Sequence, residues 1–515
     1  SVTLNEPTRD PRDTGLSESA MDIEDLASFS GAFDRIPAPS SLKEVVSSGN
    51  CMGCGICESI AGPEYIQMQV QGPKLRMRPV FKEASGPLPP ELEAKALAAC
   101  PGALVSSMPG WMPSNGMEAF LGQVKSIQRG YASDPETRLK AAAAGGLTTL
   151  ASYLIDSKTV DFVVHVKASG PLYNDVATQG SKLSFTSAEV FDGKGSHYGP
   201  KAPLKSLEDA LSLNRPFAVV AKPCDINAVR NFAKVDPRVD ELCKYLMTLS
   251  CGSYADNVCV DKFLEHNKME HSEVEEFRWR GYGCPGECPY VRTKDGREAS
   301  MQYKDFWFAN GSEAGPLTYQ WRCKMCSDFL GYQADIVVSD CWPNGEPQPR
   351  SEITEDRKHE WDGWVLVIAR TQKGQDLVDA AKAAGVMTLG PADGREVFET
   401  QPHQTRRAAS NLIRRWAHEG KHALTALDDP TKQRLMRCAL DEDYLDEIMK
   451  TGLPAPSCTD AKEQLREILP PGEDWAEAIL KMPERHLAYH LDNYKGTLRR
   501  LERGDAKESV QCLAE

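Results

Sequence analysis

The stretch Phe217-Ala-Val-Val-Ala221 is apolar throughout and is followed directly by Lys222-Pro-Cys224-Asp. Similar short apolar runs occur at residues 162–166, 336–339 and 365–369, with helical stretches such as 146–156 and 375–384 among them. Alternation of strand-like and helical segments is typical of layered α/β folds. We therefore predict a central α/β domain over residues 117–398. Cys224 would then follow a sheet strand, where a metal ligand is well placed.

Segments of different composition flank this domain. Residues 1–40 are rich in Asp, Ser and Pro and lack periodicity, which predicts a flexible N-terminal arm. Residues 41–116 are punctuated by Cys, Gly and Pro, so we expect a small second unit that ends in a linker rich in Met, Pro and Gly. Residues 399–515 are dense in Arg, Lys, Glu, Leu and Ala, which predicts a mainly helical C-terminal extension. The whole chain is thus expected to be α/β or α+β.

Charge and motif content exclude several classes of protein. The 515 residues include 60 Lys and Arg against 74 Asp and Glu, a formal net charge of -14. Nucleic-acid binding needs clustered Lys and Arg, so no nucleic-acid partner is expected. No apolar run approaches the roughly 18 residues that span a bilayer, so membrane insertion is not expected either. No hydrolase elbow, zinc-protease motif or P-loop is present.

Sixteen cysteines are the most informative feature of the composition. Large chains that lack the hydrophobic segment of a signal peptide rarely contain stabilising disulfides. Several cysteines here stand at C-x-x-C spacing, which suits a metal. We expect an intracellular protein, either of the cytoplasm or, if a transit peptide preceded Ser1, of a plastid or mitochondrion. The sequence leaves homo-oligomeric assembly open.

The strongest chemical signal is Cys51-Met-Gly-Cys54-Gly-Ile-Cys57. Three thiolates at this spacing bind three irons of a [4Fe–4S] cluster, and a distant Cys-Pro supplies the fourth ligand, here Cys100. Zinc sites more often show two separated C-x-x-C pairs. We therefore predict a [4Fe–4S] cluster on these four cysteines, called the first thiol set below, rather than a zinc knuckle.

A second group of cysteines is dispersed along the chain. Cys323 and Cys326 form one chelating pair, and two further ligands would come from Cys224, Cys251 and Cys284. From spacing alone, a second cluster and a set of buried thiols are equally supported. Six further cysteines carry no spacing signal and are interpreted as buried or surface thiols: Cys243, Cys259, Cys341, Cys438, Cys458 and Cys512.

Three loops rich in glycine and hydrogen-bond donors are candidates for cofactor binding. Gly145-Gly146-Leu-Thr148 predicts a turn that opens a helix, whose amides and hydroxyls could receive a phosphate. The others are Gly193-Lys-Gly-Ser196-His197-Tyr198-Gly-Pro-Lys201 and the stretch 278–286. Each taken alone is more often a plain turn, and the dinucleotide fingerprint is absent. The pairs His418/His422 and His486/His490 are expected on solvated helix faces rather than around a metal.

Taken together, these motifs resemble the coenzyme F420-reducing hydrogenase/dehydrogenase beta-subunit family, which includes 7-hydroxymethyl chlorophyll a reductase. They follow the family's order over roughly residues 45–400. The matching stretches are Cys51-Met-Gly-Cys54-Gly-Ile-Cys57, Ala143-Ala-Gly145-Gly146-Leu-Thr-Thr, Gly195-Ser196-His197-Tyr198, Lys222-Pro223-Cys224-Asp225-Ile226, Phe277-Arg-Trp-Arg280-Gly-Tyr-Gly-Cys284-Pro-Gly286 and Cys323-Lys-Met-Cys326-Ser-Asp-Phe-Leu-Gly-Tyr-Gln-Ala334-Asp335-Ile336.

The resemblance implies an iron–sulfur flavoprotein with a ferredoxin-like N-terminal segment, FAD and two [4Fe–4S] clusters. Ligands for the second cluster would be Cys224, Cys251, Cys323 and Cys326, called the second thiol set below, with Cys284 as the rival fourth ligand. FAD would lie near Gly145, Gly146, Thr148, Ser196, His197 and Lys201. Two departures from the family pattern are Ala-Ala-Gly-Gly in place of Ser-Gly-Gly and His197 where Lys is commoner.

These parts would convert single electrons into pairs. Clusters exchange single electrons with a donor such as ferredoxin, and the flavin passes a hydride to an organic acceptor. His197 and Tyr198 are the candidate catalytic proton donors. The leading hypothesis is a ferredoxin-linked oxidoreductase that reduces a conjugated small molecule. The alternatives are an F420-linked or electron-relay beta subunit of a larger hydrogenase or dehydrogenase complex, whose partner would be a deazaflavin, and an iron–sulfur protein without flavin.

Overall fold

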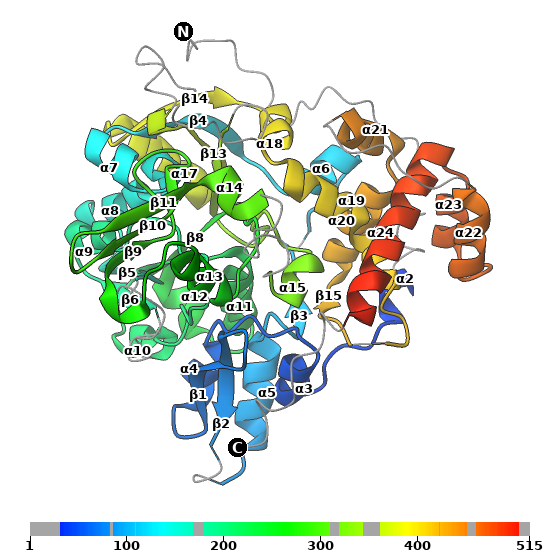
Figure 1. Ribbon diagram of the computed structural model, residues 1–515, viewed down its shortest axis with the longest axis horizontal. Helices are drawn as coiled ribbons and strands as arrows, with labels where there is room; N and C mark the ends of the chain where they lie inside the picture. Colours follow the sequence, from blue (N-terminus) through cyan, green and yellow to red (C-terminus); the bar gives the residue numbers. More distant parts are fainter. Residues whose placement is uncertain are drawn as a thin grey trace.

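A computed structural model describes residues 31–82, 86–108, 110–167, 180–308, 319–342, 361–421, 423–450 and 460–503. Within these ranges an eight-stranded mixed sheet forms the centre, with the order β14-β4-β13-β12-β8-β7-β5-β6 (Figure 1). The strands are β4 (Ser126–Ala132), β5 (Phe162–Val166), β6 (Ser181–Ser184), β7 (Phe217–Val220), β8 (Cys243–Leu249), β12 (Ile336–Asp340), β13 (Val365–Ala369) and β14 (Met387–Ala392). Four of them coincide with the apolar runs of the sequence, and the mixed α/β class is confirmed.

The inner strands β12, β8, β7 and β5 run parallel, whereas the outer pairs are antiparallel. Successive side chains face opposite cores. On one face of the sheet, Val163 and Ala218 pack in a core with α8 (Gly146–Asp156) and α17 (Gln372–Ala383). On the other face, the next residues of the two strands, Val164 and Val219, pack in a core with α11 (Pro223–Ala233). Burial on both faces explains the continuously apolar runs. The carboxyl ends of the four parallel strands therefore meet at one edge of the sheet.

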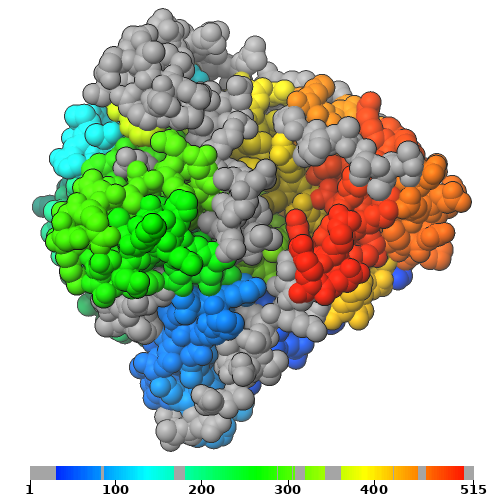
Figure 2. Space-filling view, viewed as in Figure 1, coloured from blue at the N-terminus to red at the C-terminus, as the bar shows by residue number. Residues whose placement is uncertain are grey.

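The N-terminal unit combines an antiparallel hairpin with short helices. Strands β1 (Ile66–Gln71) and β2 (Arg76–Phe81) pair beside α3 (Leu42–Ser47), α4 (Ile56–Ala61) and α5 (Pro90–Ala99). Helix α5 packs on α4 and on α11 of the central domain. Figure 2 shows this unit in blue, against the green residues of the central domain. Its ferredoxin-like character and the domain boundaries stay predictions, and most of the predicted arm lies outside the described residues.

A second, smaller sheet covers part of the central domain. It has the antiparallel order β11-β10-β9, formed by β9 (Val274–Arg278), β10 (Glu287–Thr293) and β11 (Glu298–Gln302). Helices α13 (Val258–His266) and α14 (Tyr303–Phe308) contribute to its aromatic core, which includes Trp279 and Trp307. The remaining short elements before β13 are α2 (Gly31–Asp34), β3 (Leu104–Val105), α6 (Gly116–Leu121), α7 (Pro135–Lys140), the 3-10 turn Ala143–Gly145, α9 (Ser187–Asp192), α10 (Leu207–Ser212), α12 (Arg238–Leu242), the 3-10 turn His271–Glu273 and α15 (Trp321–Lys324).

The C-terminal extension consists of packed helices, coloured from yellow through orange to red in Figure 1. They are α18 (Gly394–Thr400), α19 (Pro402–Trp416), α20 (Asp429–Leu440), α21 (Glu442–Lys450), α22 (Ala461–Ile468), α23 (Asp474–Leu480) and α24 (Glu484–Glu502). The short strand β15 (Ala426–Leu427) pairs in parallel with β3. None of the described helices is long and apolar enough to cross a membrane.

The expectation that the paired histidines lie on solvated faces is wrong. His418, His486 and His490 are all buried, because α19 packs against α20 and α24 and leaves little of these faces open. His486 Nε2 bonds to Asp446 Oδ1 at 2.6 Å, and His490 Nε2 lies 3.1 Å from the Ala439 carbonyl oxygen. His422, the fourth of these histidines, lies outside the described residues.

Candidate functional site

The first thiol set is built from one short loop and one distant residue. Its first three cysteines lie between α3 and the first turn of α4, and Cys100 directly follows α5. The loop turns tightly because Gly53 and Gly55 have φ values of +70° and +88°, a region that favours glycine. A Cβ atom at Gly53 would lie 2.4 Å from the Met77 carbonyl oxygen. This position therefore requires glycine.

Burial and mutual proximity govern the protonation of these thiols. Burial raises the pKa of Cys54 and of Cys57, and neighbouring thiols of the set raise both further. Burial and nearby Cys51 likewise raise the pKa of Cys100 to about 11. Backbone amides act in the opposite direction: a hydrogen bond from the Gly102 amide, for example, lowers the pKa of Cys100. Hydrogen bonds of this kind stabilise thiolate ligands and tune the potential of a cluster.

The second thiol set is assembled from separate elements of the fold. Cys224 lies in the first turn of α11 just beyond β7, and Cys251 follows the neighbouring strand β8. Cys323 lies on α15, and Cys326 lies in the turn after it. Burial raises the pKa of Cys251 strongly, and the other three thiols of the set raise it further. The structure therefore gathers these four cysteines in one neighbourhood, in which Cys323 is buried and the other three are half-buried.

Cys284, the rival ligand, has a different set of neighbours, which includes Asp340, Arg280 and Trp342. Trp342 Nε1 donates to Cys284 Sγ at 3.2 Å. Burial raises the pKa of Cys284 to about 11, and Asp340 is the neighbour that adds most to this effect. The other described cysteines outside both thiol sets are Cys243, Cys259, Cys288, Cys341 and Cys438. Cys458 and Cys512 lie outside the described residues.

Both thiol sets suit iron–sulfur clusters by the chemistry of their donors. Within the described ranges, no three or more His, Cys, Asp or Glu side chains are arranged to hold a single metal ion. The ligands of a [4Fe–4S] cluster bind four different irons, so they surround a volume instead of converging on one point. Against the effect of burial, Lys222 and Arg322 lower the pKa of Cys224, and Arg407 lowers the pKa of Cys323. Such cations favour the thiolate form that iron requires.

A cavity of about 250 Å³ opens at the carboxyl ends of the parallel strands. Residues at or beyond the ends of β5, β7, β8 and β12 line it, including Val166, Ala221, Ser250 and Asp340. Ligands of open α/β sheets bind at this edge, where the loops that follow the strands surround a crevice. This cavity thus lies where this sheet topology places a ligand site.

Most of the residues predicted to bind FAD meet at this cavity. Thr148, Ser196, His197 and Lys201 all line it. Gly145 and Gly146 do not line it: they begin α8, and a Cβ at Gly146 would lie 2.9 Å from Val338 Cγ1. These two glycines therefore bring the helix close to the sheet. The structure thus gives these two glycines a packing contact, and their predicted role in binding FAD stays a prediction.

The two candidate proton donors differ in what they can do. His197 is half-buried, and its Nε2 is a buried atom with no hydrogen-bond partner among the described residues. Burial, and then the charge of Lys201, lower its pKa to about 4, so the imidazole is neutral at pH 7. Burial raises the pKa of Tyr198, whose ring packs 5.1 Å from that of Trp307. Neutral His197 suits hydrogen bonding to a ligand, whereas Tyr198 retains its proton at pH 7.

An ion pair that the sequence did not single out also lines the cavity. Arg280 donates to both carboxylate oxygens of Asp340, at 2.6 and 2.8 Å. Tyr303 and Trp342 stand beside this pair on the cavity wall. The stretch 278–286 was a signal for Arg280, but no sequence signal marked Asp340 as its partner.

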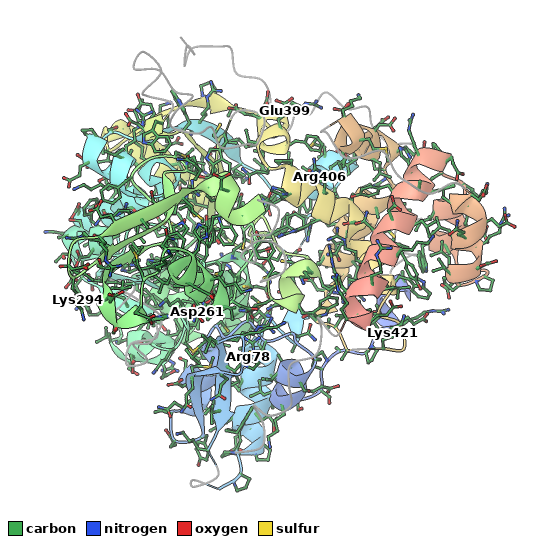
Figure 3. All side chains as sticks on the ribbon, viewed as in Figure 1. Arg78, Asp261, Lys294, Glu399, Arg406 and Lys421 are labelled. Atoms are coloured by element: carbon green, nitrogen blue, oxygen red, sulfur yellow. The ribbon has the colours of Figure 1, made fainter. Side chains whose placement is uncertain are left out.

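The C-terminal extension closes one side of the cavity. Residues 400–404, from the end of α18 and the start of α19, line it. Gln404 is 5% exposed, and Gln401 Nε2 donates to the Asp340 carbonyl oxygen at 2.7 Å. The arginines of α19 do not form an open basic patch: Arg407 donates to Ser253 Oγ at 2.7 Å, and Arg415 is buried. Figure 3 labels Arg406 on this helix, which faces the central domain.

The cavity and the two thiol sets form a continuous series. Cys251 belongs to the second thiol set and also lines the cavity. Met52, from the loop of the first thiol set, packs with Tyr254, Cys224 and Cys323 in one buried cluster. A path of buried contacts therefore leads from the first set through the second set to the cavity.

Comparisons with known proteins match the central part of the chain to one family. Two family models, for the two ends of the coenzyme F420 hydrogenase/dehydrogenase beta subunit, match the chain. The N-terminal model matches residues 127–208, and the C-terminal model matches residues 214–395. Together they cover just over half of the chain. The thiol set of the N-terminal loop and the helices after α18 lie outside both matches.

Individual relatives have low sequence identity to the chain. The chain is 31% identical to the F420-dependent formate dehydrogenase subunit beta of Methanocaldococcus jannaschii over 266 residues, half of this chain and 60% of the relative. It is 23% identical to the coenzyme F420 hydrogenase subunit beta of Methanococcus voltae over 284 residues, 52% of this chain and 84% of the relative. A solved F420-reducing [NiFe] hydrogenase complex from Methanosarcina barkeri includes a similar chain, with 19% identity and a TM-score of 0.45 over 59% of this chain and 97% of that one.

Proposed function

The chain belongs to the coenzyme F420 hydrogenase/dehydrogenase beta-subunit family, and on this premise we propose that it is an electron-relay oxidoreductase subunit. It would pass electrons between two [4Fe–4S] clusters, FAD and an F420-like two-electron carrier. The observation that carries the proposal is the buried series from the first thiol set through the second to the cavity. Cys251 carries most weight in it, because it belongs to both the second set and the cavity wall.

The relatives favour a relay over a stand-alone reductase. Those named above are beta subunits of F420-dependent formate dehydrogenase and of F420 hydrogenase. The chain spans 60% of the formate dehydrogenase relative, so its partner protein and its carrier are both part of the proposal. Reduction of a conjugated small molecule by ferredoxin is the less supported alternative, and the assay below separates the two.

The residues of this chain have distinct roles in the proposal. Bound FAD would exchange hydride with the carrier and single electrons with the clusters. Thr148 and Ser196 offer hydroxyl donors, and the ammonium group of Lys201 suits the phosphates of FAD. Neutral His197 offers a buried, unpaired nitrogen to the ring system, and such a buried group is stabilised when a ligand pairs with it. Arg280, which is held by Asp340 and lines the same cavity, would bind the carrier.

Both thiol sets would hold clusters through deprotonated sulfurs. The buried thiols have raised pKa values, so without iron they are protonated at pH 7. Binding of iron would therefore release protons from the thiols. Amides that point at the sulfurs, and the cations near the second set, stabilise the thiolates once they form.

The test begins with anaerobic purification and measurement of iron, acid-labile sulfide and flavin per chain. About eight irons and one FAD are expected, because each of the two clusters holds four irons. About four irons with FAD would remove the second cluster from the proposal, and zinc without flavin would overturn it. The loaded chain is then mixed with reduced F420 and, separately, with reduced ferredoxin. Bleaching of the flavin and clusters by F420 supports the relay, whereas reduction by ferredoxin alone supports the alternative.

A further inference from the structure

One buried arginine lies between the two thiol sets. Arg322 stands on α15 directly before Cys323, and only 7% of it is exposed. Its Nη2 donates to the carbonyl oxygen of Pro101, the residue that directly follows Cys100. A single side chain therefore joins the helix that carries Cys323 of the second thiol set to the segment that carries Cys100 of the first.

The surroundings of Arg322 are unusual for a buried cation. Among the described residues its Nη1 has no hydrogen-bond partner, and no carboxylate forms an ion pair with it in the described part of the chain. A small cavity of about 10 Å³ lies beside it and is also lined by Cys224, Cys326 and Arg415. A buried charge normally requires a counter-charge. Asp225 and Asp328 lie near enough for the charge of Arg322 to lower their pKa values, but neither forms an ion pair with it among the described residues. The other groups close to Arg322 that can supply negative charge are the thiols.

The thiols that raise the pKa of Arg322 belong to both sets. Burial opposes the charge of Arg322, yet its pKa is raised, because the thiols of Cys224, Cys326 and Cys100 lie near it. The second set contributes the first two of these and the first set contributes the third. Two other buried arginines behave differently: burial lowers the pKa of Arg370 and of Arg415 to about 10.

We propose that Arg322 is a positioning residue that couples the two clusters: its guanidinium neutralises charge on both thiol sets and fixes the distance between them. The inference rests on the proposed function, since it concerns the clusters that the two sets would hold. Each transfer moves one electron from the first cluster to the second or back, so one is oxidised as the other is reduced, and no bond or proton is involved. A reduced cluster carries one more negative charge, so a fixed cation beside both stabilises both reduced forms.

The experiment is an anaerobic redox titration followed by electron paramagnetic resonance, on the wild type and on the variants R322Q and R322K. In R322Q we expect the midpoint potentials of both clusters to become more negative by at least 59 mV, which is a tenfold change in the equilibrium constant of a one-electron reduction. R322K keeps the charge and should stay within this tenfold limit for both clusters. Magnetic coupling between the two reduced clusters, a readout of their separation, should also weaken in R322Q.

Arg370→Gln is the matched control. Arg370 is fully buried and donates to the carbonyl oxygens of Leu121, Gln123 and Leu330, but no thiol lies among the groups that shift its pKa. Its substitution should lower stability and leave both potentials unchanged. Unchanged potentials in R322Q, a shift of only one cluster, or equal shifts in R322Q and R322K would overturn the inference.

Iron content separates the possible failures. If the wild type lacks two clusters, the proposed function fails before Arg322 is tested. If R322Q binds fewer than about eight irons, R322M, which keeps most of the side-chain volume, replaces it in the titration. Loss of both clusters from every variant without the charge, with R322K fully loaded, would show that Arg322 only assembles the ligands and would overturn a role in potential.

Discussion

The two thiol sets present the same chemistry but are built in opposite ways. Three cysteines of the first set lie within seven residues, and their geometry is imposed by a loop with two glycines at positive φ. The second set draws on the ends of two parallel strands and on a short helix far along the chain. The first set is therefore specified by local backbone conformation, whereas the second depends on the whole sheet folding correctly.

The largest expected effect is loss of the second cluster on Cys224→Ser. Iron should fall to about half of the wild-type content, and electron transfer from F420 to the first cluster should fall at least about 100-fold, since even outer partners of a ligand cost 10- to 100-fold. Cys243→Ser changes a buried cysteine outside both sets and should retain full iron. Iron analysis and stopped-flow absorbance measure both quantities. Equal iron in the two variants would remove Cys224 from the ligand set.

A pair of glycine variants tests the local construction of the first set. Gly53→Ala places a Cβ at 2.4 Å from the Met77 carbonyl at a positive φ, so we expect a loss of about 1–3 kcal/mol in the free energy of unfolding, with iron lost from the first set. Gly252→Ala, next to Cys251, meets nothing within 4 Å and should be tolerated. Urea unfolding and iron analysis distinguish them. Equal sensitivity at the two positions would contradict the contrast drawn between the sets.

Low pH should lower the free energy of unfolding through His197, which lines the cavity. Burial lowers the pKa of His197 to about 4 from an ordinary 6.5, so the unfolded chain binds the proton more readily. Stability from this group is therefore complete above pH 6.5 and is lost as the pH falls towards 4, by about 3 kcal/mol in all. His197→Gln should remove this part of the slope. Urea unfolding at a series of pH values measures it, and an unchanged slope would contradict burial of the neutral form.

The smallest expected effect concerns the wall that the extension adds to the cavity. Gln404→Leu removes a buried polar group that faces the cavity and should weaken binding of FAD or F420 by about 3- to 10-fold, as expected for the loss of one hydrogen bond. Gln372→Leu, on the exposed side of α17, should leave binding unchanged. Fluorescence titration with each ligand separates the cofactor from the carrier. Identical affinities in both variants would show that the extension does not contribute to recognition.

The same contrast between local and long-range construction explains which features could be predicted from the sequence. The strands and the first thiol set were predictable, because apolar runs and C-x-x-C-x-x-C spacing are local patterns. That Cys251 lies beside Cys323 and Cys326 was not predictable, since it depends on which strand ends meet, and Cys251 as a ligand in preference to Cys284 stays a prediction. Burial of His418 and His490 was missed for the same reason: helices that look amphipathic in isolation are covered here by other helices. Asp340 gave no signal, because its partner Arg280 follows a strand of a different sheet.

Residues 423 and 425 contact the two segments that flank the cysteines of the first thiol set, and this has a consequence for the order of events during protein synthesis. Thr425 Oγ1 donates to the Gly102 carbonyl oxygen across 323 residues, and Asn50 Nδ2 donates to the Ala423 carbonyl oxygen. A ribosome that adds about 5–20 residues per second needs roughly 15–65 s to make the intervening chain. The cysteine loop thus leaves the ribosome long before the segment that covers it exists. If the loop holds a cluster, as proposed, iron would enter it during that interval, before the later part of the polypeptide covers it.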